Sequence, residues 1–182
     1  MRLLHVALFL SSLPFALCSC GLIPTSCNAV GCSDGVSVQA MTESGGLADG
    51  TYTVSIQADG NAMVRCTLDA TTLSSAPPTG QLFRARCDDA GVEVTLGARV
   101  VCTEHRSEDA VSQRCTPLEG QWELRIDVPG TPTSLRVQIA RDRDVLADET
   151  LSPRYEVSQP NGPDCDPTCR QAAPAPLVLT EP

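Results

Sequence analysis

The 182-residue sequence contains no lysine, and aromatic residues make up only 3% of it. Without lysine the chain cannot complete a Walker-type phosphate loop, whose lysine contacts the phosphates. Acidic residues outnumber basic ones by 22 to 13, which gives a formal net charge of −9. This excess argues against nucleic-acid binding, which needs basic surfaces for phosphate contacts, and against electrostatic docking on anionic lipid.

The scarcity of aromatic side chains also limits the chemistry and the core. Paired carboxylates can hydrolyse glycosides, but a glycosidase cleft needs aromatic platforms for the sugar. One Trp, two Tyr and three Phe argue against such a cleft. The core must consist mainly of aliphatic side chains, without the large buried area that aromatic rings contribute. Disulfides, each stabilising by about 2–4 kcal/mol, would offset a thin core.

No segment shows a helical period of apolar residues. Apolar and polar residues instead alternate in short runs separated by turn signals such as Asp59-Gly60 and Pro129-Gly130, which is typical of strands with one buried face. The alternation predicts strands near residues 51–57, 63–68, 82–87, 92–96, 122–128, 135–139, 145–151 and 155–157, and shorter ones near 99–103 and 177–179. This pattern predicts an Ig-like antiparallel β-sandwich of about seven to nine short strands, with a small closed β-barrel as the alternative.

The N-terminus carries an export signal. The apolar run over residues 3–17 is shorter than the roughly 20 residues of a membrane span and suits the hydrophobic region of a signal peptide. The sequence LCSCG at 17–21 then resembles the lipobox of bacterial lipoproteins, which implies cleavage before Cys20 and a diacylglycerol on its sulfur. Cys18 departs from that pattern, in which Ala, Ser or Thr is commoner. An ordinary signal peptide, cleaved after Cys18 without lipidation, is the alternative.

These features divide the chain into three parts. We expect a lipoprotein signal peptide over residues 1–19, a tether and N-terminal loop over 20–48, and a single β-sandwich domain over 49–182. The lipid would make the membrane a partner and would place the protein in the cell envelope. We expect the outer membrane, with the domain facing the periplasm or the cell surface.

Eight cysteines remain if Cys20 is lipidated. Export to an oxidising compartment favours disulfides over a thiolate metal site, although two of the close cysteine pairs resemble metal-ligand spacing. Sequence cannot resolve the pairing uniquely. Proximity along the chain and in the expected strands favours the pairs Cys27–Cys32, Cys66–Cys87, Cys102–Cys115 and Cys165–Cys169.

Few residues could carry catalysis or bind a metal. His105 is the one histidine after the signal peptide and lies in residues 104–114, which we expect to form a charged loop. A catalytic triad would add a serine and an acid, but the chain has no G-x-S-x-G elbow, so a solvated histidine is favoured over a hydrolase using His105. Asn161, Asp164 and Asp166 could supply oxygen ligands for calcium, but turn-forming roles are favoured. We expect no cofactor.

The C-terminal part carries a second resemblance. Tyr155 is followed by PNGPDCDPTCR at 160–170, which is similar to the C-terminal signature of small, Cys-rich lipoproteins of GC-rich Gram-negative bacteria, where it forms the final hairpin. That family carries no assigned activity. We therefore expect a non-catalytic binding or structural protein whose loops 104–114 and 160–169 contact an envelope or surface protein. A calcium- or small-ligand-binding module is a further alternative.

Overall fold

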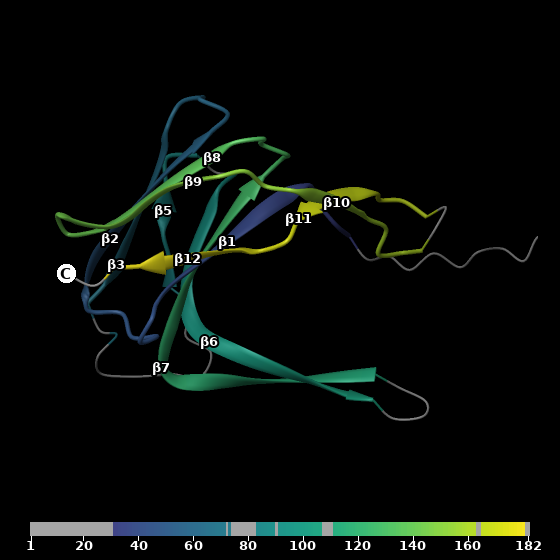
Figure 1. Cartoon of the computed structure of the whole chain (residues 1–182), viewed down its shortest axis with the longest axis horizontal. Coiled ribbons are helices and arrows are strands. Elements are labelled where there is room, and N and C mark those ends of the chain that lie inside the picture. Colours follow the sequence, from purple (N-terminus) through teal and green to yellow (C-terminus); the bar gives the residue numbers. More distant parts are fainter. Residues whose placement is uncertain are drawn as a thin grey trace, which may run out of the picture.

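Two β-sheets make up the described part of the chain. The computed structural model describes residues 31–71, 73, 83–89, 91–106, 111–162 and 165–180, without the side chains of 105, 106 and 111. Sheet A has the order β10 (Tyr155–Ser158), β11 (Cys169–Ala172), β1 (Gly35–Thr42), β7 (Val111–Pro129), β6 (Glu93–Arg106) and β4 (Phe83–Arg84), and β12 (Ala175–Leu179) also pairs with β1. Sheet B has the order β5 (Arg86–Cys87), β3 (Val64–Ala70), β2 (Gly50–Ala58), β8 (Leu135–Arg141) and β9 (Asp144–Leu151). The predicted disulfide-stapled β-sandwich is therefore confirmed (Figure 1).

The β2–β3 hairpin shows how the sequence specifies these strands. Tyr52, Val54 and Ile56 alternate with polar residues and are buried on the inner face of β2. The turn that follows contains Asp59 and Gly60, which both adopt positive φ, and the amide of Asn61 donates to the carbonyl of residue 58 at 2.9 Å. Two central residues with positive φ match the twist of a tight hairpin, so the Asp59-Gly60 signal places the turn. The register, with Ile56 opposite Val64, leaves one more residue on the β3 side of this turn than a two-residue loop would.

The core lies between the inner faces of the two sheets. Sheet A contributes Val38, Leu96, Leu124 and Ile126 among others, and sheet B contributes residues such as Ile139; each of these is at most 1% exposed. The aromatic contribution is small, as the composition predicts. Trp122 is buried, and its ring lies 6.1 Å from that of Phe83 at a tilt of 56°. The core therefore depends on aliphatic packing between sheets.

Several details of the predicted fold are wrong. The described residues form twelve strands, and β6 and β7 are long, with 14 and 19 residues. Sheet A is mixed, because β1 runs parallel to β11 and β12. The segment 20–48, expected to be a tether and loop, contains β1. In β1 the apolar positions include Ala40 and the outward positions include Met41, so the contrast between its two faces is weak in the sequence.

Two of the four expected disulfides are confirmed. Cys66 lies directly opposite Cys87, and Cys102 directly opposite Cys115, and each pair is bonded. Each of these bonds links neighbouring antiparallel strands, so sequence proximity and strand register agree.

The other two expected pairs are wrong, because Cys32 is bonded to Cys169 across a sequence separation of 137. The parallel pairing of β1 with β11, which sets Gly35 opposite Gln171, brings these distant cysteines together. Cys165 is also disulfide-bonded, to a partner outside the described residues. Cys27 itself lies outside the described residues.

Candidate functional site

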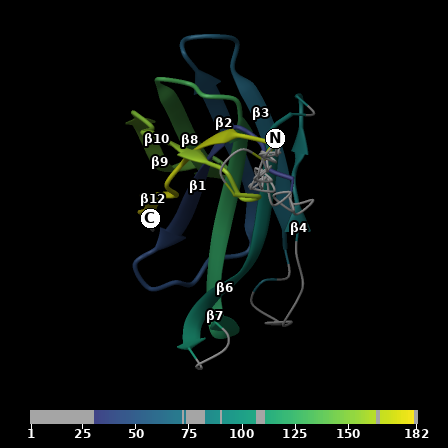
Figure 2. The ribbon, with the colours of Figure 1, turned by 90° about the vertical axis from the view of Figure 1, so that its right-hand side faces the viewer.

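A two-stranded arm projects from the sandwich. We define the arm as residues 100–106 of β6 and 111–117 of β7, which pair in continuous antiparallel register from Val100 opposite Pro117 to Arg106 opposite Val111. Figure 1 shows this pair leaving the two sheets and turning away from them, and Figure 2 shows it reaching beyond the other strands. No third strand covers the arm in the described part of the chain.

An irregularity at the base of the arm lets it leave sheet A. The register jumps from Ala98 opposite Trp122 to Val100 opposite Pro117, so that β7 carries several extra residues. Among them Gly120 adopts a positive φ of 68°. Extra residues in one strand bend the pair and increase its twist. The bend separates the arm from the core.

Both faces of the arm are in contact with solvent. Every side chain at residues 100–104 and 112–116 is exposed. Val100 and Val101, which are 54% and 45% exposed, point to opposite faces because successive residues of a strand alternate. The arm thus presents apolar and polar groups on two faces, and none of them contributes to the core.

The outer edges of the arm are also open. In the sandwich β6 pairs with β4 only at Leu96 and Thr95, and β7 pairs with β1 only from Pro129 to Leu124. Beyond these positions the described strands provide no second neighbour for either strand of the arm. Open strand edges present backbone N–H and C=O groups that can pair with another polypeptide.

The expectation of an irregular loop at 104–114 is wrong, since β6 continues to Arg106 and β7 starts at Val111. The backbone of His105 lies in β6, directly opposite Ser112. The prediction failed because both faces of this ribbon are exposed to solvent. Its sequence therefore lacks the apolar–polar alternation from which strands were predicted. The side chain of His105 lies outside the described part of the chain.

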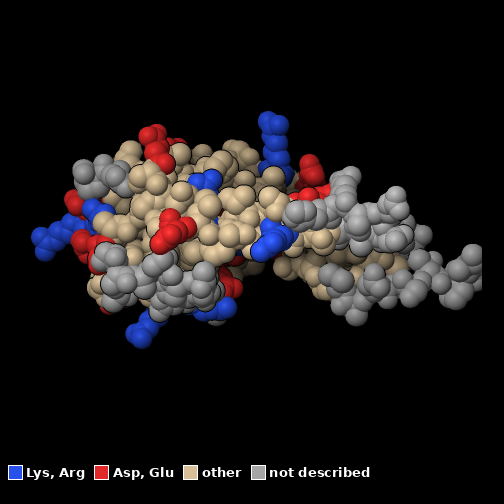
Figure 3. Space-filling view, turned by 90° about the horizontal axis from the view of Figure 1, so that it is seen from below, with Lys and Arg blue, Asp and Glu red and all other residues tan. Residues whose placement is uncertain are grey.

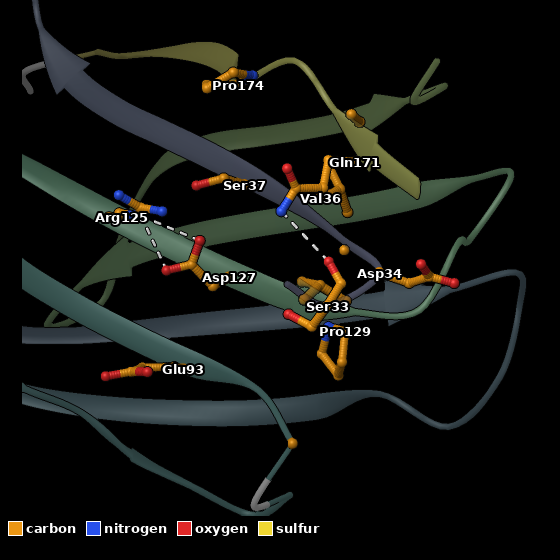
Figure 4. Close-up of a pocket in the computed structure, with 14 residues that line it drawn as sticks. Ser33, Asp34, Val36, Ser37, Glu93, Arg125, Asp127, Pro129, Gln171 and Pro174 are labelled. Carbon is orange, nitrogen blue, oxygen red and sulfur yellow. Dashed lines mark hydrogen bonds and ion pairs between the residues drawn. The ribbon is translucent and has the colours of Figure 1, made fainter. Parts of the chain in front are cut away.

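A polar groove forms a second candidate site. It has a volume of about 490 Å³ and lies at the end of sheet A where β1 begins (Figure 4). Asp34, Glu93 and Asp127 contribute carboxylates, and Arg125 contributes a guanidinium. The groove was not predicted, because its described lining residues come from four segments that are distant in the sequence.

The carboxylates of the groove already have partners. Arg125 donates through Nε to both oxygens of Asp127, at 3.1 and 2.9 Å. Glu93 forms an ion pair with Arg84, and Asp34 accepts a hydrogen bond from the backbone N–H of residue 170 at 2.7 Å. These contacts hold strand ends together. The described residues that line the groove include no histidine or cysteine.

Ser37 lies on the floor of the same groove. Its Oγ is buried and makes no hydrogen bond with the described residues. A buried hydroxyl without a partner costs about 1–3 kcal/mol. Among the described residues, the Ser37 hydroxyl is the buried side-chain polar group that lacks a hydrogen-bond partner.

The loop after β10 uses its polar groups internally. Asn161 is 8% exposed and donates through its side-chain amide to the carbonyl of Asp166 at 2.7 Å. This contact places the side-chain nitrogen of Asn161 in a hydrogen bond within the loop, which is consistent with a turn-forming role. Asp164 lies outside the described residues. The described part of the chain contains no group of three residues placed to hold a metal ion.

Charge on the described surface is mixed. Figure 3 shows arginine and acidic side chains interspersed on one face of the molecule, separated by uncharged residues. Exposed ion pairs such as Arg136–Asp148, with 2.8 Å between the guanidinium and the carboxylate, add to this pattern. Arg136 lowers the pKa of Asp148 chiefly through this hydrogen bond.

No helix in the described residues is both long enough and apolar enough to cross a bilayer; Cys20, the expected lipidation site, lies outside them. Comparisons with protein-family models, curated proteins and solved structures find no match. The fold defines the protein as a disulfide-stapled β-sandwich with a projecting arm.

Proposed function

We propose that this protein is a lipid-anchored component of the cell envelope that binds another envelope protein through its arm, without catalysing a reaction. The lipobox-like sequence ending at Cys20 supports the anchor. The described disulfides support an oxidising compartment, where such bonds persist. The single observation that carries the binding role is the arm, a long ribbon that leaves the core and exposes both faces and both edges.

The arm suits a protein partner better than other partners. An open strand edge recognises an extended polypeptide by backbone hydrogen bonds, and the side chains beside it add specificity. The acidic composition disfavours nucleic acid and anionic lipid. A partner strand added to the free edge of β6 would also lie beside Val100 on one face and Val101 on the other, and both of these side chains are exposed.

The topology separates the proposed anchor from the arm. The chain enters sheet A at Gly35, which lies opposite Pro129, whereas the bend at Trp122 lies beyond Leu124, which is opposite Ala40. At roughly 3.3 Å per residue, Pro129 and Trp122 lie about 20 Å apart along β7. A tether that ends at Gly35 therefore leaves the base of the arm unobstructed.

Lipidation is tested by metabolic labelling of cells with a clickable fatty acid. We expect label on the wild-type chain, loss of label in C20A, and retained label in the matched variant C18A. Intact mass should show a mature chain that begins at Cys20. An unlabelled mature chain that begins at Ser19 would contradict the anchor.

Binding through the arm is tested by site-specific photocrosslinking in cells. A photoreactive residue replaces Thr103 on the arm or, as the control, Thr150 on the edge strand β9; both threonines are exposed. We expect position 103 to give an adduct of one discrete mass and position 150 to give none. Equal adducts from both positions, or no adduct from position 103, would contradict recognition by the arm.

A further inference from the structure

The cysteines of the described disulfides differ sharply in exposure. Cys66 is fully buried, at 0% exposed, and its partner Cys87 packs against the core. Cys169, which is bonded to Cys32, is 2% exposed. In the arm, by contrast, Cys102 and Cys115 are both exposed. Of the three fully described disulfides, Cys102–Cys115 is the one in which both cysteines are exposed to solvent.

Exposure matters because disulfide exchange requires direct attack. A thiolate must approach one sulfur of the bond, so the rate depends on access as well as on thiol chemistry. The residues next to this disulfide on the same face are Val100 and Glu104 on β6, with Pro117 and Gln113 on β7, according to the register and the alternation of strands. All four belong to the arm, and both cysteines are exposed, so no described residue of the sandwich shields the bond.

The arm also depends on this bond more than the sandwich does. A two-stranded ribbon without a third strand or a packed face is marginally stable in water. The bond links residues 13 apart in sequence and is the covalent tie between the two strands of the arm. On the sandwich side of the bend at Ala98, the pairing of β6 with β7 is stabilised by packing in the core. On the arm side it is not.

We propose that Cys102–Cys115 is a thiol–disulfide exchange site whose reduction by a dithiol protein of the envelope opens the arm. One thiolate of that dithiol attacks the sulfur of Cys102 or Cys115, the bond between the two sulfurs breaks, and the other cysteine leaves as a thiolate and takes up a proton. The second thiol of the reductant, as its thiolate, then attacks the reductant's own sulfur in the mixed disulfide. The bond between that sulfur and the protein cysteine breaks, and this cysteine also leaves as a thiolate and takes up a proton. Two electrons pass from the dithiol to the cysteine pair, and the reductant leaves as a disulfide.

This site would regulate the arm. The exchange itself needs only the exposed bond, whereas its effect on recognition rests on the proposed function. Opening the arm would remove the ordered strand edges that a partner strand needs. The reduced protein would therefore bind less well, while the sandwich, with its buried disulfides intact, would stay folded.

Selective exchange is tested on the full mature chain. The oxidised protein is treated with a thioredoxin-type dithiol or with dithiothreitol, free thiols are trapped with a maleimide at successive times, and mass spectrometry measures each cysteine. We expect Cys102 and Cys115 to be labelled roughly tenfold faster than Cys66 and Cys87, because access limits attack on a buried bond. Opening of all bonds at one rate, or of a buried bond first, would overturn the exchange site.

Hydrogen exchange tests the opening of the arm. In the partly reduced protein, and in the variant C102A/C115A, amides of 100–106 and 111–116 should lose protection while those of β2 and β8 keep it. Unchanged protection in the arm would overturn the switch. Crosslinking at position 103 that is equally strong in oxidised and C102A/C115A protein would overturn only the regulatory role, whereas its absence from both would count against the proposed function and leave selective exchange standing.

Discussion

Two disulfides of similar loop length allow the independence of the arm to be measured. Cys66 and Cys87 are 21 residues apart, and Cys102 and Cys115 are 13 apart. The chain-entropy relation for cross-links gives about 3 kcal/mol for each loop at 25 °C. The two bonds should therefore constrain the unfolded chain almost equally, and they differ in where they lie in the folded state.

We predict that C66A/C87A lowers the free energy of unfolding of the sandwich by about 3 kcal/mol. The effect should be somewhat larger than the entropy alone, because alanine also removes a buried sulfur at Cys66. The matched variant C102A/C115A should leave the sandwich unchanged. Its cost falls on the arm, which can open by itself as a local unit.

The assay is guanidinium unfolding monitored by tryptophan fluorescence. Trp122 is the one tryptophan of the chain and is 4% exposed between the sheets, so its emission reports the sandwich. We expect C66A/C87A to move the midpoint down by about 1 M, given the usual dependence of stability on denaturant. C102A/C115A should unfold at the wild-type midpoint.

The reasoning fails if the arm variant lowers the Trp122 transition as much as C66A/C87A does. That result would mean that the arm and the sandwich unfold as one cooperative unit despite the bend at Ala98. It would also weaken the idea that reduction opens the arm alone.

Two further predictions concern single side chains. Tyr52 is buried and donates from its hydroxyl to the carbonyl of Ala48 at 2.7 Å, so Y52F should destabilise the protein by about 1 kcal/mol in denaturant titrations; Y155F, which removes a hydroxyl at a more exposed site, should cost less, and the reverse order would contradict the argument from burial. The side-chain hydrogen bond from Thr133, with backbone donors beside it, lowers the pKa of Asp59. This carboxylate therefore stabilises the fold above its unfolded pKa of about 3.9, and that contribution is lost as pH falls through the lower folded pKa. D59N, which still tolerates the positive φ of this turn, should be less stable than wild type near neutral pH, and the gap should close in acid; a gap that is constant with pH would exclude the charge as its cause.

The strands that the sequence predicted well are those with one buried face. In residues 52–57 of β2 and 135–139 of β8 apolar residues alternate with polar ones, and the apolar residues are the ones that form the core, so the alternation predicts the inner face correctly; Ser55 is the one polar residue of these two stretches that is also buried. The turn at Asp59-Gly60 adds a local signal that does not depend on the rest of the chain. These strands could therefore be predicted from local sequence alone, without knowing the order of strands in the sheet.

The features that the sequence did not predict depend on long-range pairing or on exposure. Nothing near Cys32 indicates Cys169, because their contact arises from the parallel pairing of β1 and β11. The arm has solvent on both faces, so charged residues occupy positions that an ordinary strand would fill with apolar ones. The groove at Asp34 and Arg125 likewise exists only once distant strand ends have met.

A disulfide and two hydrogen bonds hold the chain where it enters the sandwich, at residues 32–34, and this arrangement would suit a tethered protein. A pull on the segment before Cys32 would reach β1 first, and β1 could peel from its neighbours one residue at a time. The bond from Cys32 to Cys169 instead passes such a pull to the start of β11. Asp34 adds two contacts at the same place, from its carboxylate to the N–H of residue 170 at 2.7 Å and from its carbonyl to the N–H of Gly130 at 3.1 Å. If the protein is anchored through Cys20, the long-range disulfide lies between the anchor and the fold, where a covalent tie protects the sheet from its own tether.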